Sequence, residues 1–470
     1  MRQFPLDQLD KLPGHVVEWQ LKARDATALS QRVEHRKNAS FNQSKHFSSV
    51  KETRNSHNPL ASWLAITLEL DGVLNREALE AALLFLARRH EVLRCEFQHL
   101  AGDLSCDVCA PEDIELEACD CGDVGTTAEL QAFLMAGFER NTDTLAWPLY
   151  TMGAVIRDDG PTTVYLAFDH IVSDGISLLF VVNDIEVAYA AFCRGEEVDL
   201  PAVGGYADFA HEQRARYGSI DDADDRLDYW KAFASDGGEF FPRFPLDIGV
   251  EPGSLHDVVS DSGTLLSFEE AEAFDARCRE AGGKVFMGVL AAVAISLRKE
   301  GGPDVYRGLM PVSERGRGEW QKSVGWFVNT LPIEFSVAAD LEFAQIMAGV
   351  RAGFTEMMTS ADVPFVRAWQ LLSPELFSLH SWPYPVNFFS YIDTTRFPGS
   401  EHHEGWNPTA YVWSANSNSA NSWFLRDAEG VHFNSIYADT PKGRAVMAGV
   451  HRSLRETLQA MAAVALPAGA

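Results

Sequence analysis

The chain of 470 residues is predicted to have an α/β fold made of two lobes of similar size. Strand-like and helix-like hydrophobic patterns mix along its whole length, without repeats or low-complexity tails, as is typical of globular α/β proteins. A hydrophobic content of 46% is enough for large cores. The most loop-like stretches are 218–225 and 234–254, which follow the first helical block. We therefore place a boundary near residue 215 and predict lobes at 1–215 and 216–470.

The first lobe is predicted to contain two strands, each followed by a helix. Residues 62–70 (SWLAITLEL) form the first strand, and Asn75 can cap the next helix, in which leucines recur at helical spacing. Residues 162–170 (TTVYLAFDH) alternate as a strand does, and 175–192 (GISLLFVVNDIEVAYAAF) have the length and bulk of a largely buried helix. Gly175 permits the sharp turn between them.

The second lobe is predicted to contain two consecutive helices. Residues 267–270 (SFEE) form a capping box, which indicates a helix start. We expect this helix to stop at Gly282 and Gly283. Residues 285–299 (VFMGVLAAVAISLRK) then form the next helix.

Composition and charge exclude several classes of protein. With 67 acidic and 39 basic residues the net charge is −28, which argues against a nucleic-acid partner. The longest apolar stretches, 178–182 and 286–297, are too short or too soon interrupted to span a bilayer, and the N-terminal residues lack an apolar signal segment. We therefore expect a soluble, cytoplasmic protein without stable membrane insertion.

The seven cysteines do not form a disulfide framework, because their number is odd and they are spread along the chain. Cys106, Cys109, Cys119 and Cys121 offer four thiols of the kind that zinc sites use. The last two are separated by a single residue, and the surrounding sequence alternates as strands do. Small apolar strand residues are therefore favoured over a metal site.

His170 lies at the end of the second predicted strand, on its apolar face by the parity of strand positions. A partly desolvated imidazole there can stay neutral at pH 7 and accept a proton from a substrate. Asp174, four residues on, can cap the next helix or accept a charged hydrogen bond from a distant arginine. A lone inward histidine is more often a satisfied core residue than a catalyst. This stretch by itself leaves both interpretations open.

Nine segments along the chain carry motif-like residues. Five lie in the N-terminal half: SFNQSKHF (40–47), RRHEVLRCEF (88–97), DHIVSDG (169–175), YADFAHEQR (206–214) and DYW (228–230). Four lie in the C-terminal half: PVSER (311–315), VGWFVNTLPIEF (324–335), DVPFVRAWQ (362–370) and VNFFSYID (386–393). In this order they resemble the motifs of the condensation-domain superfamily of acyltransferases, and the resemblance covers nearly the whole chain. DHIVSDG is similar to the family's His-His-x-x-x-Asp-Gly active-site motif.

The resemblance implies two chloramphenicol-acetyltransferase-like lobes in a V-shaped pseudo-dimer, with the active site between them. A tunnel would admit an acyl thioester on a phosphopantetheine arm from one side and the acceptor from the other. The implied acyl donor is an acyl or peptidyl carrier protein, or coenzyme A. No permanently bound cofactor is implied.

The resemblance also assigns roles to individual residues. His170 corresponds to the motif's second histidine, which activates or orients the acceptor nucleophile, and is the expected general base. Asp174 and Arg315 would form a buried ion pair that holds the loop. Arg317 is the rival partner if the loop register differs, because SERGRGEW holds two arginines close together.

Five further residues are assigned to the active-site loop or tunnel: Asp169, Gly175, Gly325, Trp326 and Asn329. A tryptophan among Val, Phe and Val is equally a core residue. Asp169 stands where the family motif has its first histidine, which puts a simple peptide-forming domain in doubt. Because strand parity turns Asp169 away from His170, we expect a structural role, with tuning of the imidazole as the alternative.

Missing motifs narrow the chemistry further. The sequence has no Gly-x-Ser-x-Gly elbow, no Gly-rich phosphate loop and no metal-ligand array, so a covalent acyl-serine, a kinase and a metalloenzyme lack support. Direct acyl transfer is therefore expected. No carrier-protein segment or adenylation domain is recognised either, so we expect a stand-alone enzyme whose donor comes from elsewhere.

The predicted function is a stand-alone acyltransferase of secondary metabolism that joins an acyl or aminoacyl thioester to a hydroxyl or amine of a small-molecule acceptor. A polyketide-associated acyltransferase that esterifies trehalose or a lipid alcohol is the first alternative, since residues 14–23 and 241–249 also resemble that group. A non-catalytic docking or epimerising module is the second, and the presence of His170, Asp174 and Arg315 counts against it. Pocket shape, rather than sequence, decides the donor and acceptor and whether an ester or an amide forms.

A short basic stretch is a candidate for donor docking. An acidic protein needs a local positive patch to bind an anionic carrier protein or coenzyme A. Residues 22–37 concentrate five basic side chains: Lys22, Arg24, Arg32, Arg36 and Lys37. We hypothesise that this stretch, or arginines near Arg315, guides the donor, with a solvated basic helix as the alternative.

Overall fold

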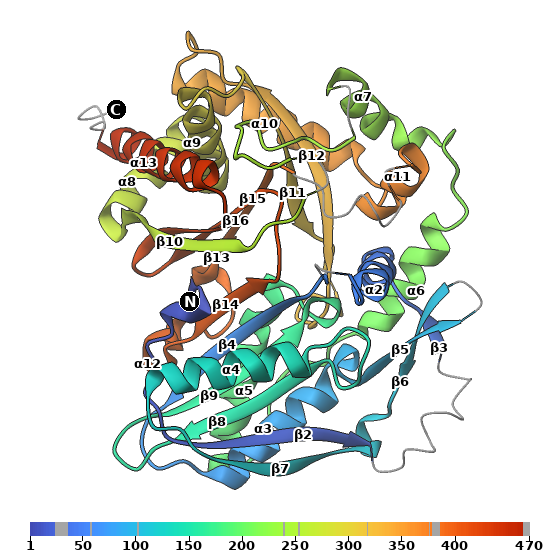
Figure 1. The fold of residues 1–470 in the computed structure, drawn as a ribbon, viewed down its shortest axis with the longest axis vertical. Helices are drawn as coiled ribbons and strands as arrows, with labels where there is room; N and C mark the ends of the chain where they lie inside the picture. Colours follow the sequence, from blue (N-terminus) through green and yellow to red (C-terminus); the bar gives the residue numbers. More distant parts are fainter. Residues whose placement is uncertain are drawn as a thin grey trace. The chain divides into compact units, whose positions relative to one another are not determined.

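The computed structural model describes residues 1–23, 36–56, 59–100, 103–237, 240–251, 254–316, 318–375, 377 and 386–463 (Figure 1). The chain divides into two compact units. The first comprises Met1–Ser219, Ser313–Val328 and Thr394–Ser414, and the second Ile220–Val312, Asn329–Asp393 and Ala415–Ala470. Two segments from the C-terminal half of the chain therefore fold with the first unit.

The first unit is built on a seven-stranded sheet. Its order is β1 (Arg2–Phe4), β14 (Thr409–Ser414), β4 (Ser62–Leu70), β9 (Thr162–Asp169), β8 (Tyr150–Ile156), β2 (His15–Ala23) and β7 (Ile114–Asp123). Neighbouring strands are antiparallel except β1 and β14, which are parallel. The central strand β9 is buried along all of its eight residues, so its C-terminal end delivers His170 from the middle of the sheet.

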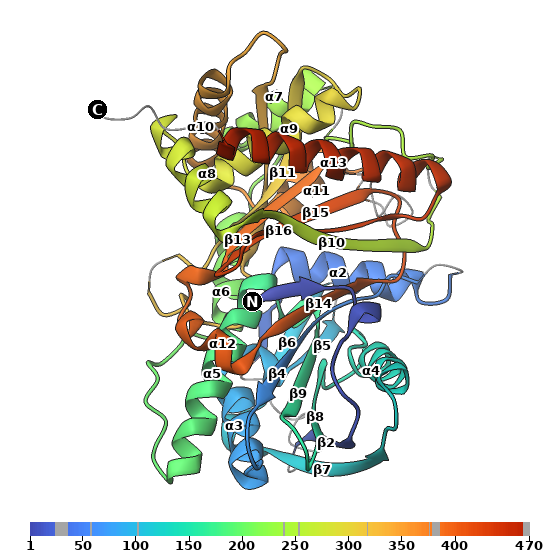
Figure 2. The same ribbon diagram turned by 90° about the vertical axis from the view of Figure 1, so that its left-hand side faces the viewer.

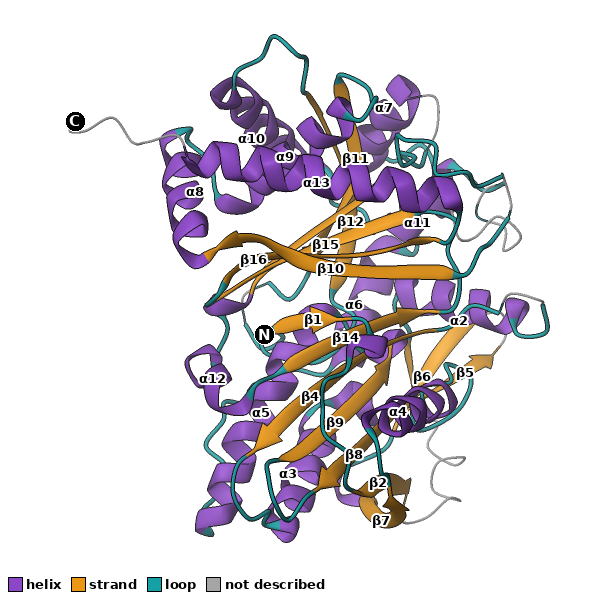
Figure 3. Cartoon of the chain, turned by 60° about the vertical axis from the view of Figure 1, so that its left-hand side comes forward, coloured by secondary structure: helices purple, strands orange, loops and turns teal. Residues whose placement is uncertain are grey.

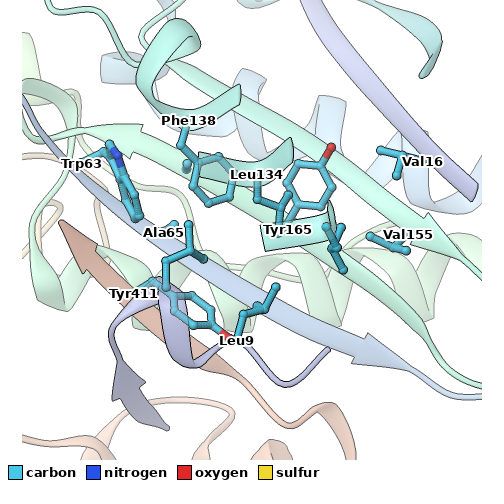
Figure 4. Close-up of a cluster of buried hydrophobic side chains, with 12 residues drawn as sticks. Leu9, Val16, Trp63, Ala65, Leu134, Phe138, Val155, Tyr165 and Tyr411 are labelled. Carbon is cyan, nitrogen blue, oxygen red and sulfur yellow. The ribbon is translucent and has the colours of Figure 1, made fainter. Parts of the chain in front are cut away.

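Helices cover both faces of this sheet. The helices of the first unit are α2 (Phe41–Thr53), α3 (Arg76–Arg89), α4 (Thr127–Asn141), α5 (Gly175–Arg194), α6 (Tyr206–Tyr217) and α12 (His403–Trp406). α3 and α5 pack together on one face and α4 lies on the other (Figures 2 and 3). On the α4 face, Leu134 and Phe138 pack against Trp63, Tyr165 and Tyr411 from three neighbouring strands (Figure 4). Burying these large apolar side chains fixes the strand that carries the site.

A small second sheet completes the first unit. Its order is β3 (Arg36–Asn38), β6 (Asp103–Val108) and β5 (Cys95–Leu100). Three of the four cysteines lie in strands as predicted, Cys106 in β6 and Cys119 and Cys121 in β7, whereas Cys109 follows the end of β6. Cys121 is exposed, so it is not a core residue. Cys106 packs in a small buried cluster with Cys95 and Ala207.

The second unit is built on a six-stranded sheet. Its order is β10 (Val258–Ser267), β16 (Gly430–Ala438), β15 (Ala420–Asp427), β13 (Phe388–Asp393), β11 (Val305–Ser313) and β12 (Val328–Ser336). Its helices are α7 (Asp228–Gly237), α8 (Phe268–Glu280), α9 (Val285–Lys299), α10 (Phe343–Ser360), α11 (Phe365–Leu372) and α13 (Pro441–Ala463). α13 packs against α8, α9 and β10 (Figure 2). Each unit is thus a sheet covered by helices, and the predicted α/β class is confirmed.

Short 3₁₀ helices connect many of these elements. They are η1 (Leu6–Gln8), η3 (Glu91–Arg94), η4 (Pro111–Asp113), η5 (His170–Val172), η6 (Asp225–Leu227), η8 (Thr394–Arg396) and η9 (Ser400–His402). Among them, η5 joins β9 to α5, where the sequence predicts a sharp turn. The strand ends at Asp169, one residue earlier than predicted, because His170 already belongs to η5.

The predicted helix starts agree with the structure. Asn75 caps α3 by accepting a hydrogen bond from the Ala78 backbone N–H. Ser267 opens α8 through a complete capping box with Glu270. The side-chain oxygens replace the carbonyl partners that the first helical N–H groups lack, which is why both starts are readable from sequence.

One described helix, α5, is long and apolar enough to cross a membrane. The bent pair α8–α9 would also be long and apolar enough if the two helices formed one span. The expectation that every apolar stretch is too short is therefore wrong for α5. In this structure 67% of the apolar window of α5 is buried inside the protein. Packing against α3 and β4 accounts for its composition as a core helix.

Candidate active site

Two aspartates, one on each side of His170, shape the turn between β9 and α5. Asp169 ends β9 and caps η5, because its Oδ1 accepts a hydrogen bond of 2.7 Å from the Ile171 N–H. Asp174 caps α5, because its Oδ1 accepts from the Ser177 N–H at 2.8 Å. The turn is therefore fixed at both ends by side chains encoded within it.

Asp174 and Arg315 form a buried, bidentate ion pair. Arg315 Nη2 donates to Asp174 Oδ1 at 2.8 Å and Nη1 donates to Oδ2 at 3.0 Å. The two side chains are 3% and 4% exposed, so neither charge is solvated by water. Such a pair holds only when its hydrogen bonds are complete, and Arg315 Nε also donates to the Ser323 carbonyl. The structure thus brings together the two residues that the resemblance pairs, while the rival Arg317 lies outside the described residues.

The segment 325–327 is held to this turn through its backbone. The Gly325 N–H donates to Ser177 Oγ, the carbonyl of residue 326 accepts from Tyr206 Oη, and the N–H of residue 327 donates to Asp174 Oδ2. A Cβ at Gly325 would lie 2.3 Å from the Tyr206 ring, so no larger residue fits. The position of the Trp326 side chain is therefore set by its main chain.

A second buried histidine supports the same segment. His90 Nδ1 accepts from the Val324 N–H at 3.3 Å, so its Nε2 carries the proton and donates to Asp184 at 2.9 Å. Burial lowers the pKa of His90, although the Asp184 carboxylate raises it. The ring is therefore a neutral support. His90 lies in the segment RRHEVLRCEF, and the family resemblance assigns this histidine no role.

His170 itself is half-buried and contacts the Trp326 indole, with ring centroids 4.2 Å apart. Burial lowers the pKa of His170, as does a positive charge on His46, whereas its own backbone, Asp174 and Asp169 raise it. Nδ1 is buried and makes no hydrogen bond to another described residue. The imidazole is therefore neutral near pH 7 and has Nε2 left to receive a proton.

Asp169 lies in a hydrogen-bond network that no sequence pattern predicts. The carboxylate is 1% exposed and accepts from the Thr144 hydroxyl at 2.5 Å. His46 Nε2 lies 3.2 Å from Thr144 Oγ1 and 3.4 Å from Asp169 Oδ1. His46 also contacts Trp326, with ring centroids 5.6 Å apart. Its signal in the sequence is its spacing of three residues from Gln43, which places both on one helix face.

The remaining predicted residues have different locations. Gly175 is the first residue of α5. Asn329 belongs to the second unit, where its Oδ1 accepts from the Phe365 N–H at the start of α11 at 2.8 Å. That hydrogen bond ties β12 to α11. A role for Asn329 in a tunnel stays a prediction.

The basic stretch before α2 is largely paired in its described part. Lys22 lies 3.1 Å from Glu117, Arg36 2.8 Å from Asp107, and Lys37 2.6 Å from Asp208. Arg24 and Arg32 lie outside the described residues. The described basic side chains therefore already have carboxylate partners, and the proposed docking role stays a hypothesis.

A neutral imidazole on a rigid turn can remove the proton of a hydroxyl or amine while that group attacks a thioester. The protein belongs to the class of acyltransferases. More particularly, the chain belongs to the condensation-domain family, whose model matches residues 53–373. The family that the nine segments indicate is thereby confirmed.

Three relatives illustrate this likeness. The 2'-acyl-2-O-sulfo-trehalose (hydroxy)phthioceranyltransferase PapA1 of Mycobacterium tuberculosis is 28% identical over 395 residues, which cover 81% of this chain and 73% of that protein. Acyltransferase PapA3 of the same organism is 23% identical over 464 residues, covering 97% and 96%. The solved structure of the PapA2 acyl transferase matches with a TM-score of 0.87 at 22% identity, over 98% of this chain and 100% of that one. The structural match establishes the fold.

Proposed function

We propose that the protein transfers an acyl group from a thioester directly to a hydroxyl or amine of a small-molecule acceptor, with His170 as the general base. The state of His170 carries this proposal: its ring is half-buried, its pKa is lowered, and its Nδ1 is enclosed. A base must be unprotonated before the reaction begins, and burial favours that form.

The proton and electron pairs balance without any further reactant. The acceptor oxygen or nitrogen attacks the thioester carbonyl carbon while His170 Nε2 takes its proton. The tetrahedral intermediate then collapses, the carbon–sulfur bond breaks, and the thiolate takes the proton from the imidazolium. An ester or amide and a free thiol result, and His170 returns to its neutral form. Such proton transfer is typically worth ~10²–10⁴-fold in rate.

Asp174 and Arg315 support the reaction by geometry rather than by proton transfer. Both Asp174 oxygens are occupied by Arg315, Ser177 and the N–H of Phe327. A carboxylate engaged in this way has no free lone pair directed at His170. Its proposed task is to keep the turn rigid, so that the imidazole meets the acceptor in a reactive orientation.

The proposed donor is a phosphopantetheine thioester, on a carrier protein or on coenzyme A. Membership of the condensation-domain family supports this choice. We propose that the protein meets its donor in the cytoplasm. The seven cysteines are all free, which suits a reducing compartment.

A sugar hydroxyl is the second candidate for the acceptor. The name of PapA1 states that this relative acts on an acylated, sulfated trehalose, and the likeness extends over 81% of this chain. Esterification of trehalose or of a lipid alcohol is therefore the narrower alternative. A non-catalytic docking module is disfavoured, because the structure preserves a complete support for His170.

The direct test is a product assay. The protein is incubated with octanoyl- or palmitoyl-coenzyme A, each with trehalose, a fatty alcohol or an amino acid, and the products are followed by mass. We expect an acylated acceptor and one equivalent of free coenzyme A with at least one pair. Thioester hydrolysis with no acylated acceptor would contradict acyl transfer. A product formed equally well by His170→Ala would contradict the assigned base.

A further inference from the structure

α2 contacts the turn between β9 and α5 at two adjacent points. The helix begins with a capping box between Ser40 and Gln43. Gln43 Nε2 then donates to the carbonyl of Ile171, inside the turn, at 2.9 Å. His46 follows Gln43 by one helical turn and lies on the same face of α2. Its partners, Asp169 and Thr144, border that same turn.

The Thr144 hydroxyl fixes the proton arrangement at His46. This hydroxyl has a single proton, which it donates to Asp169 Oδ2 at 2.5 Å. Toward His46 Nε2, at 3.2 Å, it must therefore accept. Nε2 carries a proton that also faces Asp169 Oδ1 at 3.4 Å.

Trp326 links the two imidazoles. His46 meets the indole nearly edge-on, with an interplanar angle of 80°, and His170 contacts it at 4.2 Å and 40°. The main chain of Trp326 is fixed by Tyr206 Oη at its carbonyl. His46 therefore contacts two residues near His170, the Trp326 indole and the Asp169 carboxylate.

The charged groups around the two rings also couple them. Asp169 Oδ1 lies 3.4 Å from His46 Nε2, and the negative charges of Asp174 and Asp169 both raise the pKa of His170. After burial, a positive charge on His46 is the next influence that lowers the pKa of His170, and Asp174 and Asp169 act in the opposite direction. A cation at His46 thus favours the neutral, basic form of His170.

We propose that His46 is a positioning residue of the acyl transfer, which holds the Trp326 indole against His170. A positive charge on His46 would act in the same direction as burial and lower the pKa of His170. The inference rests on the proposed role of His170 as the general base. It gives Asp169 a purpose as well, since this carboxylate orients His46 from the position at which the family motif has a histidine.

Two variants separate positioning from simple structural support. His46→Phe keeps an aromatic ring against Trp326 but removes the N–H that Thr144 accepts. His46→Gln keeps an N–H donor and removes the titrating ring. His211→Gln, at an exposed position of α6, is the matched control. Each is compared with the parent by kcat, KM for the acyl-coenzyme A, melting temperature and the pH dependence of kcat.

We expect His46→Phe to lower kcat roughly 10- to 100-fold through misplacement of His170, with an unchanged KM and melting temperature. His46→Gln should recover most of that loss. Its kcat should nevertheless fall at a higher pH than in the parent, because His170 lacks the neighbouring positive charge. A parental kcat in His46→Phe would overturn the inference. Equal losses in both variants, with lower melting temperatures and a parental pH midpoint, would reduce His46 to a structural residue.

A titration without turnover keeps this test separate from that of the proposed function. NMR of carbon-13-labelled histidine follows the His170 ring, which is assigned by its absence in His170→Ala. We expect His170 to titrate at higher pH in His46→Gln than in the parent or in His211→Gln. Identical titration in all three overturns the inference, whether or not any thioester is turned over. A shifted titration in a protein that acylates no acceptor would instead contradict only the proposed function.

Discussion

The two aspartates that flank His170 are equally buried, yet they have different partners. Asp174 faces Arg315, whose charge is permanent, in a bidentate pair. Asp169 faces a hydroxyl, a backbone N–H and the His46 imidazole. The Asp174 side is therefore a fixed support held by a permanent cation, whereas the Asp169 side is a hydrogen-bond network without one. Burial alone does not define a carboxylate's role, because the partner decides it.

The largest effect is expected at the residue that both supports hold. His170→Ala should lower turnover by ~10²–10⁴-fold and leave the melting temperature near that of the parent. The reason is that alanine removes a proton acceptor from a half-buried site with little loss of packing. Turnover is measured with the active thioester and acceptor pair, and folding by circular dichroism. Parental turnover in a folded variant would make His170 a core residue.

Breaking the fixed support should instead reduce stability. Asp174→Ala and Arg315→Ala each leave an unpaired buried charge and should each cost ~3–5 kcal/mol in the free energy of unfolding. The double variant should lose less than the sum of the single losses, since the same pair is broken once. Chemical denaturation of all four proteins closes this cycle. Full additivity would show that the two residues are not partners.

A matched pair of amides compares the two supports directly. Asp174→Asn leaves Arg315 without a counter-charge, whereas Asp169→Asn leaves no permanent cation behind. We therefore expect Asp169→Asn to cost only about 1–3 kcal/mol, the usual range for a weakened buried hydrogen-bond network, and Asp174→Asn to cost more. Denaturation curves of both variants test the order. A reversed order would contradict the distinction between the two sides.

The smallest effect is the pH dependence of stability. The pKa values of His90 and His170 are both lowered from 6.5, mainly by burial. The unfolded chain therefore binds more protons than the folded one below about pH 6.5, and the free energy of unfolding should fall as pH decreases from there. His170→Ala should show a shallower slope between about pH 6.5 and 5 than the parent. Equal slopes in the two proteins would place His170 outside this effect.

Local sequence signals predict the parts of the site that are close together in the chain. His170 and Asp174 are separated by one turn, and the strand, the turn and the helix around them each have their own pattern. Arg315 is different, because it pairs with Asp174 across 141 positions. No periodicity links such distant residues. Only the resemblance to a family made that pair predictable.

Other features depend on packing that no local pattern encodes. His46 acquires its partners because α2 packs against η5. Likewise, β14 has the alternation of an ordinary strand, and nothing in residues 409–414 indicates that they pair with β4 of the first unit. Parity placed Asp169 on the same strand face as Tyr165 and Ala167, but that face is also apolar and packs against α4. Parity did not identify Thr144 and His46 as the partners of Asp169. These contacts are decided by tertiary structure.

The insertion of β14 between β1 and β4 has a consequence for synthesis of the chain. β1 begins at Arg2 and its hydrogen-bonding partner begins at Thr409, so the sheet cannot close until most of the polypeptide has left the ribosome. Arg315 and Trp326 also emerge more than a hundred residues after His170. Until these segments are synthesised, β4 has an open edge and Asp174 lacks its arginine partner. An intermediate with such exposed groups is of the kind that chaperones protect. Residues 1–219 expressed alone would lack β14 and Arg315, so the edge of β4 and the carboxylate of Asp174 would stay without these partners.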